Sequence, residues 1–129
     1  MLTRRYSWEE RLDRARVDLG TNPQFVLFFR DLHYGSNFPT ERVQNAHARG
    51  MTPVISLEIS RWGDTGYLDE VVKGEFDEYF REWSENAKEC GLEVMLRFGF
   101  EMNGDWFPRD PNPKNLSWHG SVRMTFSVK

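Results

Sequence analysis

Three apolar runs separated by helical patterns constrain the fold of this chain more than any other feature. The runs span residues 25–29, 53–59 and 92–98. The first run, residues 25–29, lacks polar alternation, which predicts a parallel strand buried on both faces. Strands that alternate with helices predict a parallel βαβαβ unit with right-handed connections, so we expect an α/β fold.

Helix signals precede and separate these runs. Residues 7–10 (SWEE) have the S-x-x-E form of a capping box, and a first helix is expected from there to Gly20. A short second helix is expected over residues 40–49. A longer helix follows Gly74 and ends at Gly91, with an apolar stripe placed against the sheet. The stripe consists of Phe76, Tyr79, Phe80, Trp83, Ala87 and Cys90.

Composition narrows the possible partners. The 129 residues carry a formal net charge of -3 and no run of Lys or Arg, which opposes a nucleic-acid partner. No apolar run approaches the ~20 residues that span a membrane, so no membrane role is expected. Aromatic residues make up 15%, which suits either sugar binding or a large core. The single cysteine, Cys90, cannot form an internal disulfide, and we expect it to be a buried apolar residue.

Residues that follow the predicted strands are expected to meet at one edge, because parallel strands end on the same side of a sheet. No glycine-rich phosphate-binding pattern occurs at any strand end, and no spacing forms a recognisable metal site. The predicted site therefore relies on side chains, with no cofactor and no metal. Its candidates are Asp31 and His33, Glu58 to Trp62, and Phe100 to Trp106.

The segment from Arg97 to Pro108, RFGFEMNGDWFP, carries the most specific motif. It resembles the end of the fourth strand in glycoside hydrolase family 26, the endo-β-1,4-mannanase-like family, where R-x-x-H-E-M-N-G precedes W-[YF]-P. Residues 101–104 match four consecutive positions of that pattern. The Pro-led strand ending in Glu58 and the helix after Gly74 are also similar, so the resemblance spans roughly residues 25–108.

The resemblance implies a partial (β/α)8 barrel that contains strands two to four of eight, preceded by a helix. A complete barrel takes about 250 residues, so this chain encodes at most half of one. It also implies a retaining endo-glycosidase that hydrolyses β-linked polysaccharide, mannan by resemblance, with xylan or mixed-linkage glucan possible. Glu101 would be the general acid/base that protonates the leaving oxygen. The implied substrate-binding residues are Trp106, Phe100, Asn103, Glu58 and Trp62.

Each residue of the motif also has a plainer interpretation. Glu101 could be a solvated or helix-capping carboxylate, Trp106 a core ring, and Asn103 a residue that fixes the turn. Aromatic neighbours such as Phe100 would raise the pKa of Glu101, whereas Arg97 would lower it if it pointed toward the carboxylate. The sequence leaves that balance open.

The candidates at the two earlier strand ends are equally open. Glu58 and Trp62 could line a sugar cleft, or they could be a surface carboxylate and a loop-packing ring. Asp31 and His33 could join the site or form a solvated pair at the start of a loop.

The chain departs from the family pattern at one position of the motif, at the residue directly after it, and in the missing nucleophile. Phe100 replaces the family histidine, and Arg109 stands where an aromatic residue is more usual. The family nucleophile is a Glu on the seventh strand, about 5–5.5 Å from the acid in a retaining site, and this chain has no counterpart. Glu58 is not expected to replace it, because a neighbouring strand does not place it across the scissile bond.

Three functional outcomes therefore remain. The chain can be an inactive piece of a glycosidase, since half of a two-carboxylate mechanism does not cleave the bond. It can be a non-catalytic carbohydrate-binding remnant in which Trp62, Trp106 and Phe107 still stack on sugars. It can also be an open sheet that self-associates through unpaired edges.

The last part of the chain fits neither the family nor a helical pattern. We therefore divide the chain into a partial barrel domain, residues 1–116, and an atypical tail, residues 117–129. Read in the shifted frame, codons compatible with the tail can encode A-W-x-x-x-x-D-I-F, which resembles the next helix of the family. A frameshift near residue 116 is our hypothesis, with a divergent terminus as the alternative, and the flanking DNA would decide. The family is commonly secreted, but no signal peptide is recognisable here, so localisation stays unknown.

Overall fold

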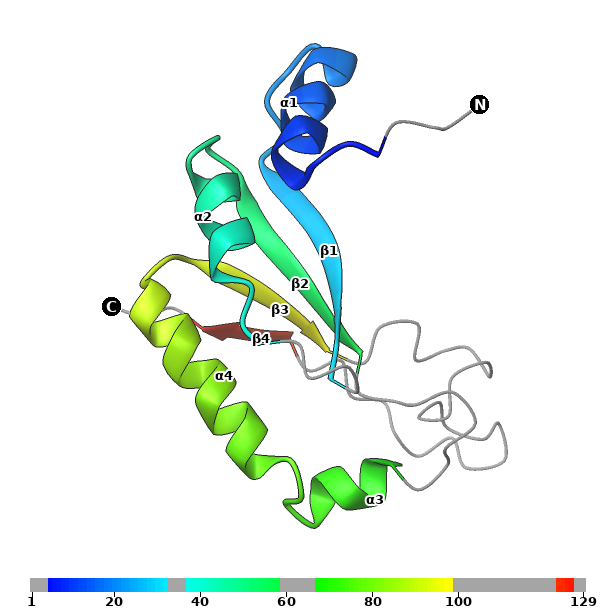
Figure 1. Ribbon diagram of the computed structural model, residues 1–129, viewed down its shortest axis with the longest axis vertical. Helices are drawn as coiled ribbons and strands as arrows, with labels where there is room; N and C mark the ends of the chain where they lie inside the picture. Colours follow the sequence, from blue (N-terminus) through cyan, green and yellow to red (C-terminus); the bar gives the residue numbers. More distant parts are fainter. Residues whose placement is uncertain (1–4, 33–36, 59–66, 99–122, 127–129) are drawn as a thin grey trace.

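A four-stranded sheet with helices packed against it forms the fold, as seen in a computed structural model that describes residues 5–32, 37–58, 67–98 and 123–126 (Figure 1). The elements in chain order are α1 (Trp8–Leu19), β1 (Phe25–Asp31), α2 (Thr40–His47), β2 (Thr52–Glu58), α3 (Tyr67–Val72), α4 (Asp77–Cys90), β3 (Val94–Phe98) and β4 (Arg123–Phe126). The strands lie in the order β1-β2-β3-β4. The first three are parallel, which confirms the predicted mixed α/β unit preceded by a helix.

Two elements were not predicted from the sequence. α3 has only 6 residues, too few for an apolar periodicity to stand out. β4 has 4 residues and lies in the tail, residues 117–129, where it pairs antiparallel with β3. Such pairing depends on contacts between segments far apart in sequence, which a local pattern does not indicate.

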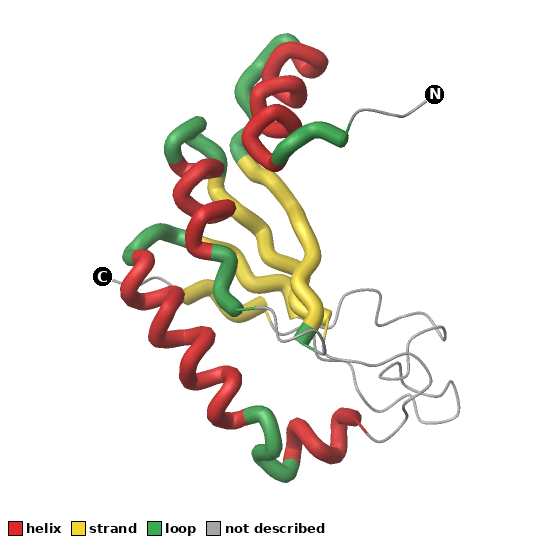
Figure 2. Tube along the Cα trace, viewed as in Figure 1, coloured by secondary structure: helices red, strands yellow, loops and turns green. Residues whose placement is uncertain are grey.

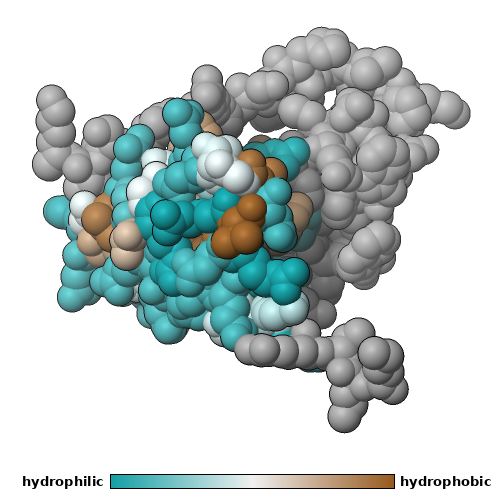
Figure 3. All heavy atoms as spheres, turned by 90° about the horizontal axis from the view of Figure 1, so that it is seen from above, coloured by the Kyte–Doolittle hydropathy of each residue, from teal (hydrophilic) through white to brown (hydrophobic). Residues whose placement is uncertain are grey.

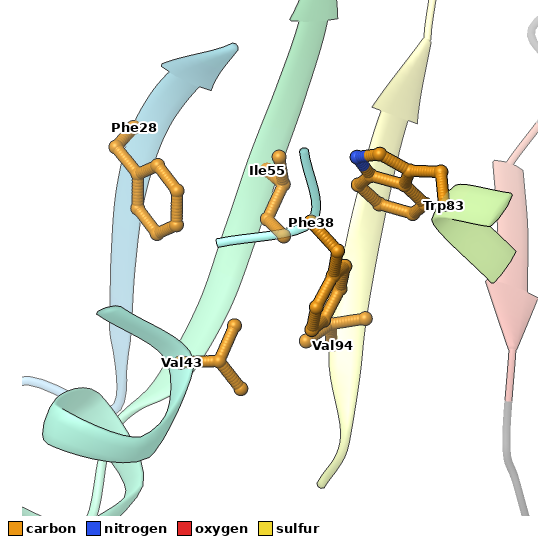
Figure 4. Close-up of a cluster of buried hydrophobic side chains, with 6 residues drawn as sticks. All are labelled: Phe28, Phe38, Val43, Ile55, Trp83 and Val94. Carbon is orange, nitrogen blue, oxygen red and sulfur yellow. The ribbon is translucent and has the colours of Figure 1, made fainter. Parts of the chain in front are cut away.

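The main core forms between the three parallel strands and the helices that connect them (Figure 4). Phe28 of β1, Ile55 of β2 and Val94 of β3 pack with Val43 of α2 and Trp83 of α4. Ile55 and Val43 are both 0% exposed. These strand residues share one face of the sheet, because Phe28 is the register partner of Ile55. α2 and α4 therefore cover the same face (Figure 2).

The remaining two helices lie on that face as well. The Trp8 ring of α1 meets the Phe28 ring edge-on, with 5.2 Å between ring centroids. Val71 of α3 packs against the cluster of Leu32 and Leu57, and Leu57 alternates with Ser56 along β2 and so points the same way as Ile55. All described helices thus cover one face, and we call the opposite side the helix-free face.

The helix-free face contradicts the prediction that β1 is buried on both faces. Phe25, Leu27 and Phe29 point to this side and are 55%, 46% and 57% exposed. An unbroken apolar run does suit burial on both sides, but the described elements supply a covering layer on only one. Seen from above, by contrast, the described surface is mostly hydrophilic, with small separate apolar areas (Figure 3).

The ends of α1 confirm the sequence signals for this helix. The Ser7 side chain accepts a hydrogen bond from the Glu10 N–H, and the Glu10 carboxylate accepts one from the Ser7 N–H at 2.9 Å, which is the predicted capping box. Gly20 follows the helix in the left-handed region with φ 64°, and its N–H donates to the Val17 carbonyl.

Two polar contacts attach α1 to the end of α2. Arg49 donates from Nε and Nη2 to the two carboxylate oxygens of Asp13, at 2.7 and 3.1 Å. Asn45 donates to the Glu9 carboxylate at 2.8 Å. The hydrogen bond from Arg49 lowers the pKa of Asp13, because the guanidinium stabilises the charged carboxylate.

We expect Val43→Ala to lower the free energy of unfolding by about 2 kcal/mol, since it removes two buried methyl groups and leaves a cavity. Val72→Ala makes the same change in α3 at a residue that is 85% exposed. It should change the free energy of unfolding by less than about 0.5 kcal/mol. Urea denaturation followed by far-UV circular dichroism measures both. Equal effects would contradict the core described above.

Replacement of Asp13 by Asn should make stability less dependent on pH in the acidic range. Because the pKa of Asp13 is lower in the folded state, its contribution is fully present above the ordinary value of 3.8 and is lost as pH falls through the folded value. The stability difference between the two proteins should therefore shrink below about pH 4. Arg49→Gln removes the donor of the hydrogen bonds to Asp13 and should reduce the dependence of stability on pH in the same way.

Candidate acidic edge of the sheet

The carboxyl ends of β1 and β2 place two acidic residues next to each other. Asp31 and Glu58 are the last residues of these strands and are register partners. Their backbones are about 5 Å apart, the usual spacing of paired strands. The Leu32 N–H donates to the Glu58 carbonyl at 2.9 Å, which holds the chain after β1 against the end of β2. The prediction that Asp31 and Glu58 meet at one edge is confirmed.

Both acids lie on the helix-free face, and an arginine joins them there. Ser56 alternates with Glu58 along β2 and is the register partner of both Phe29 and Arg97. Arg97 therefore lies one strand away from Glu58 and diagonal to it, a separation that a long side chain can span. Arg97 is exposed, whereas Asp31 and Glu58 are half-buried. The edge thus combines two carboxylates with one guanidinium on one face.

Ser56 is a functional candidate that the sequence analysis missed. It is 0% exposed, and its hydroxyl has no hydrogen-bond partner within the described part of the chain. An unpaired buried hydroxyl costs about 1–3 kcal/mol, which makes Ser56 a candidate hydrogen-bonding group behind the acidic edge. The signal was present in the sequence, because Ser56 interrupts an otherwise apolar run over residues 53–57.

Positive charge also lies on the helix-covered side of β1. The Arg30 Nε is buried and has no hydrogen-bond partner among the residues described. Burial lowers the pKa of Arg30, and the nearby charge of Arg42 lowers it further. The Arg42 guanidinium itself lies over the Trp8 and Phe28 rings, 5.3 and 5.6 Å from their centroids. Burial raises the pKa of the Tyr79 hydroxyl, although the charge of Arg30 opposes this.

The structure describes only part of the predicted site. It brings together Asp31 and Glu58 of that site and adds Ser56 and Arg97, which were not among the predicted site residues. The other predicted residues lie outside the described residues, namely His33, Trp62, Phe100, Glu101, Asn103, Trp106 and Phe107.

The chemistry of this edge is that of hydrogen bonding and charge. Within the described ranges, no three His, Cys, Asp or Glu side chains gather closely enough to hold a metal ion. None of the described helices is both long and apolar enough to cross a membrane. Carboxylates accept and a guanidinium donates several hydrogen bonds each, which suits a ligand rich in hydroxyl groups.

The fold and edge define the chain as a mixed α/β unit with a three-stranded parallel sheet and acidic residues at its carboxyl end. Compared with protein-family models, with curated proteins and with solved structures, the chain has no significant match in any of the three.

Ser56→Ala should leave the free energy of unfolding unchanged or raise it by up to about 1 kcal/mol, because it removes a hydroxyl that lacks a partner. Thermal and urea denaturation measure the change. Ser84→Ala is the control: the Ser84 hydroxyl donates to the Arg81 carbonyl at 2.8 Å on an exposed helix face, so its loss tests an ordinary bonded serine. A loss of more than about 1 kcal/mol for Ser56→Ala would show that Ser56 is bonded within the protein.

Proposed function

We propose that this chain is part of the (β/α)8 barrel of a retaining endo-glycosidase that acts on β-linked polysaccharide, mannan by resemblance, with Glu101 as the general acid/base. The observation that carries the proposal is the one-sided arrangement of the helices. Three parallel strands lie next to each other in chain order, and every described helix covers the same face.

This arrangement is the one that a segment of a barrel has. A complete doubly wound fold differs, because its strand order reverses and helices cover both faces of the sheet, although each of its βαβαβ halves also has neighbouring strands in chain order with helices on one face. In a barrel, neighbouring strands follow chain order, and all helices lie outside, so the other face of the sheet turns inward. The helix-free face, with Phe29, Ser56 and Glu58, would then line the interior.

The acidic edge supports a site of the glycosidase kind. Active sites of such barrels lie at the carboxyl ends of the strands, where Asp31 and Glu58 meet. Glu101 follows the end of β3 by three residues in the sequence. We assign to Glu101 the protonation of the leaving oxygen and then the activation of water. Glu58 would accept hydrogen bonds from sugar hydroxyls.

The remaining substrate contacts follow from the motif. Trp106 and Trp62 would provide flat rings for the apolar faces of sugar units, with Phe100 and Asn103 beside the acid. Asp31 and Glu58 are on adjacent strands and share one side of the edge, so neither is assigned the role of nucleophile. The chain by itself should therefore bind the sugar without cleaving it.

One observation favours the alternative of a non-catalytic carbohydrate-binding remnant. β4 pairs antiparallel with β3, at the edge where a barrel would place its next parallel strand. While β4 occupies that edge, no parallel strand can pair with β3 and continue the barrel. Under this alternative the aromatic residues still bind sugar, and no version of the site cleaves it.

Titration with mannohexaose by isothermal calorimetry tests the sugar site. We expect saturable binding that Trp106→Ala weakens about 2- to 13-fold, the effect of losing about 0.5–1.5 kcal/mol of ring contact. Glu101→Gln should keep the affinity within about 2-fold, because the amide retains the shape of the acid. A reducing-sugar assay should detect no cleavage by the chain alone.

Trp118→Ala is the matched control, since this tryptophan lies in the tail and outside the predicted site. It should leave the affinity for mannohexaose unchanged. Absence of binding, or an equal loss of affinity in the two tryptophan variants, would refute the proposed sugar site. Cleavage by the chain alone would instead show that a nucleophile lies within these 129 residues.

A further inference from the structure

β1 is an outer strand of the described sheet, and its apolar segment, residues 25–29, contains no Lys, Pro or bulge. Within the described residues it pairs only with β2. Residues 25–29 are all apolar, and the first charged residue of the strand is Arg30. The pairing with β2 runs without interruption from Phe25 to Asp31, so no bulge bends the edge away. Lys, Pro or a bulge protects most natural edge strands.

We propose that the β1 edge is a self-association site at which a second copy of this chain pairs antiparallel, around a two-fold axis through Leu27. The three side chains that β1 presents on the helix-free face are all large and apolar, and they are 46% to 57% exposed. Two such strands would join the sheets of the two copies into one.

The order of residues in β1 selects the register of this pairing. When Leu27 lies opposite Leu27 of the second copy, Phe25 of each copy lies opposite Phe29 of the other. Every pair on the helix-free face is then apolar, which favours cross-strand contact. An axis through Phe28 would instead oppose Phe25 with Asp31, an apolar ring with a carboxylate.

The arrangement of the helices is compatible with this interface. α1 lies at the amino end of β1 (Figure 1). Because the paired strands run in opposite directions, the α1 helices of the two copies lie at opposite ends of the joined strands.

The other outer strand is a poorer partner for β1. β4 is shorter, with 4 residues, and its sequence begins with Arg123. Pairing of β1 with β4 of the next copy would be head-to-tail, and it would leave free edges that continue into a filament. A two-fold contact closes after two copies, so we expect a dimer.

The exposed area predicts a weak dimer. Phe25, Leu27 and Phe29 each leave on the order of 100 Å² accessible, against the roughly 800 Å² per partner that a stable interface buries. Hydrogen bonds between the two edges add to this contact. The dimer should therefore depend on concentration.

Sedimentation velocity of the 129-residue chain over about a hundredfold range of concentration tests the proposal. The mass should rise from 15.3 kDa toward about twice that value as the concentration increases. L27K should remain a monomer over the same range, because it places two lysines against each other at the axis. Val17→Lys on α1, at a residue that is 79% exposed, should dimerise like the unmodified chain.

Mixing L27K with L27E tests the register itself. Each variant alone should be monomeric, whereas an equimolar mixture should regain the dimer through a Lys–Glu pair at the axis. Circular dichroism verifies that the variants fold. If a charged variant does not fold, Leu27→Thr takes its place in the monomer test, because threonine is polar and suits a strand. A monomer at every concentration, particles larger than a dimer, or no recovery in the mixture of folded variants would overturn the proposal. None of these outcomes depends on mannohexaose binding.

Discussion

Packing of the helices on a single face of the sheet is the constraint from which the rest of the structure follows. Ile55 and Val43 are completely buried where β2 meets α2, and Trp83 of α4 extends the same core toward β3. Burial of large apolar side chains is the main favourable term in folding, so this layer fixes which residues of each strand face inward. Strand alternation then sends the remaining residues to the helix-free face.

That alternation links the core to the candidate site. Ile55 and Leu57 are held on the helix side, so Ser56 and Glu58 must point to the other side. In the same way, Phe28 sends Asp31 to the helix-free face. The acidic edge is therefore a consequence of the core and of the register between β1 and β2. A shift of one residue in that register would separate the two carboxylates.

The sequence was sufficient to predict the elements that have strong local signals. The capping box at Ser7, the glycine at the end of α4 and the apolar runs gave the first three strands and three of the helices within a few residues. Local signals failed where tertiary context decides. Nothing in the run from Phe25 to Phe29 indicates that only one of its two faces is covered.

The candidate site also contains residues that the sequence predicted and others that only the structure revealed. Strand ends predicted that Asp31 and Glu58 would be neighbours, because parallel strands end together. Ser56 was missed because burial of its hydroxyl depends on packing from neighbouring strands. The role of Glu101 rests on the motif alone, since a resemblance carries information about chemistry that strand geometry does not.

The two outer strands decide how this sheet can relate to a barrel. Barrel closure requires a parallel partner at each outer strand. Among the described strands β1 pairs only with β2, whereas β3 is paired on its other side with an antiparallel strand. The obstacle to a barrel thus lies in β4 and in the tail that contains it, and not in the three parallel strands. The core beneath the helices and the pairing of Asp31 with Glu58 lie in β1, β2, β3 and the helices, whereas Arg97 at the acidic edge is the register partner of Arg123 in β4.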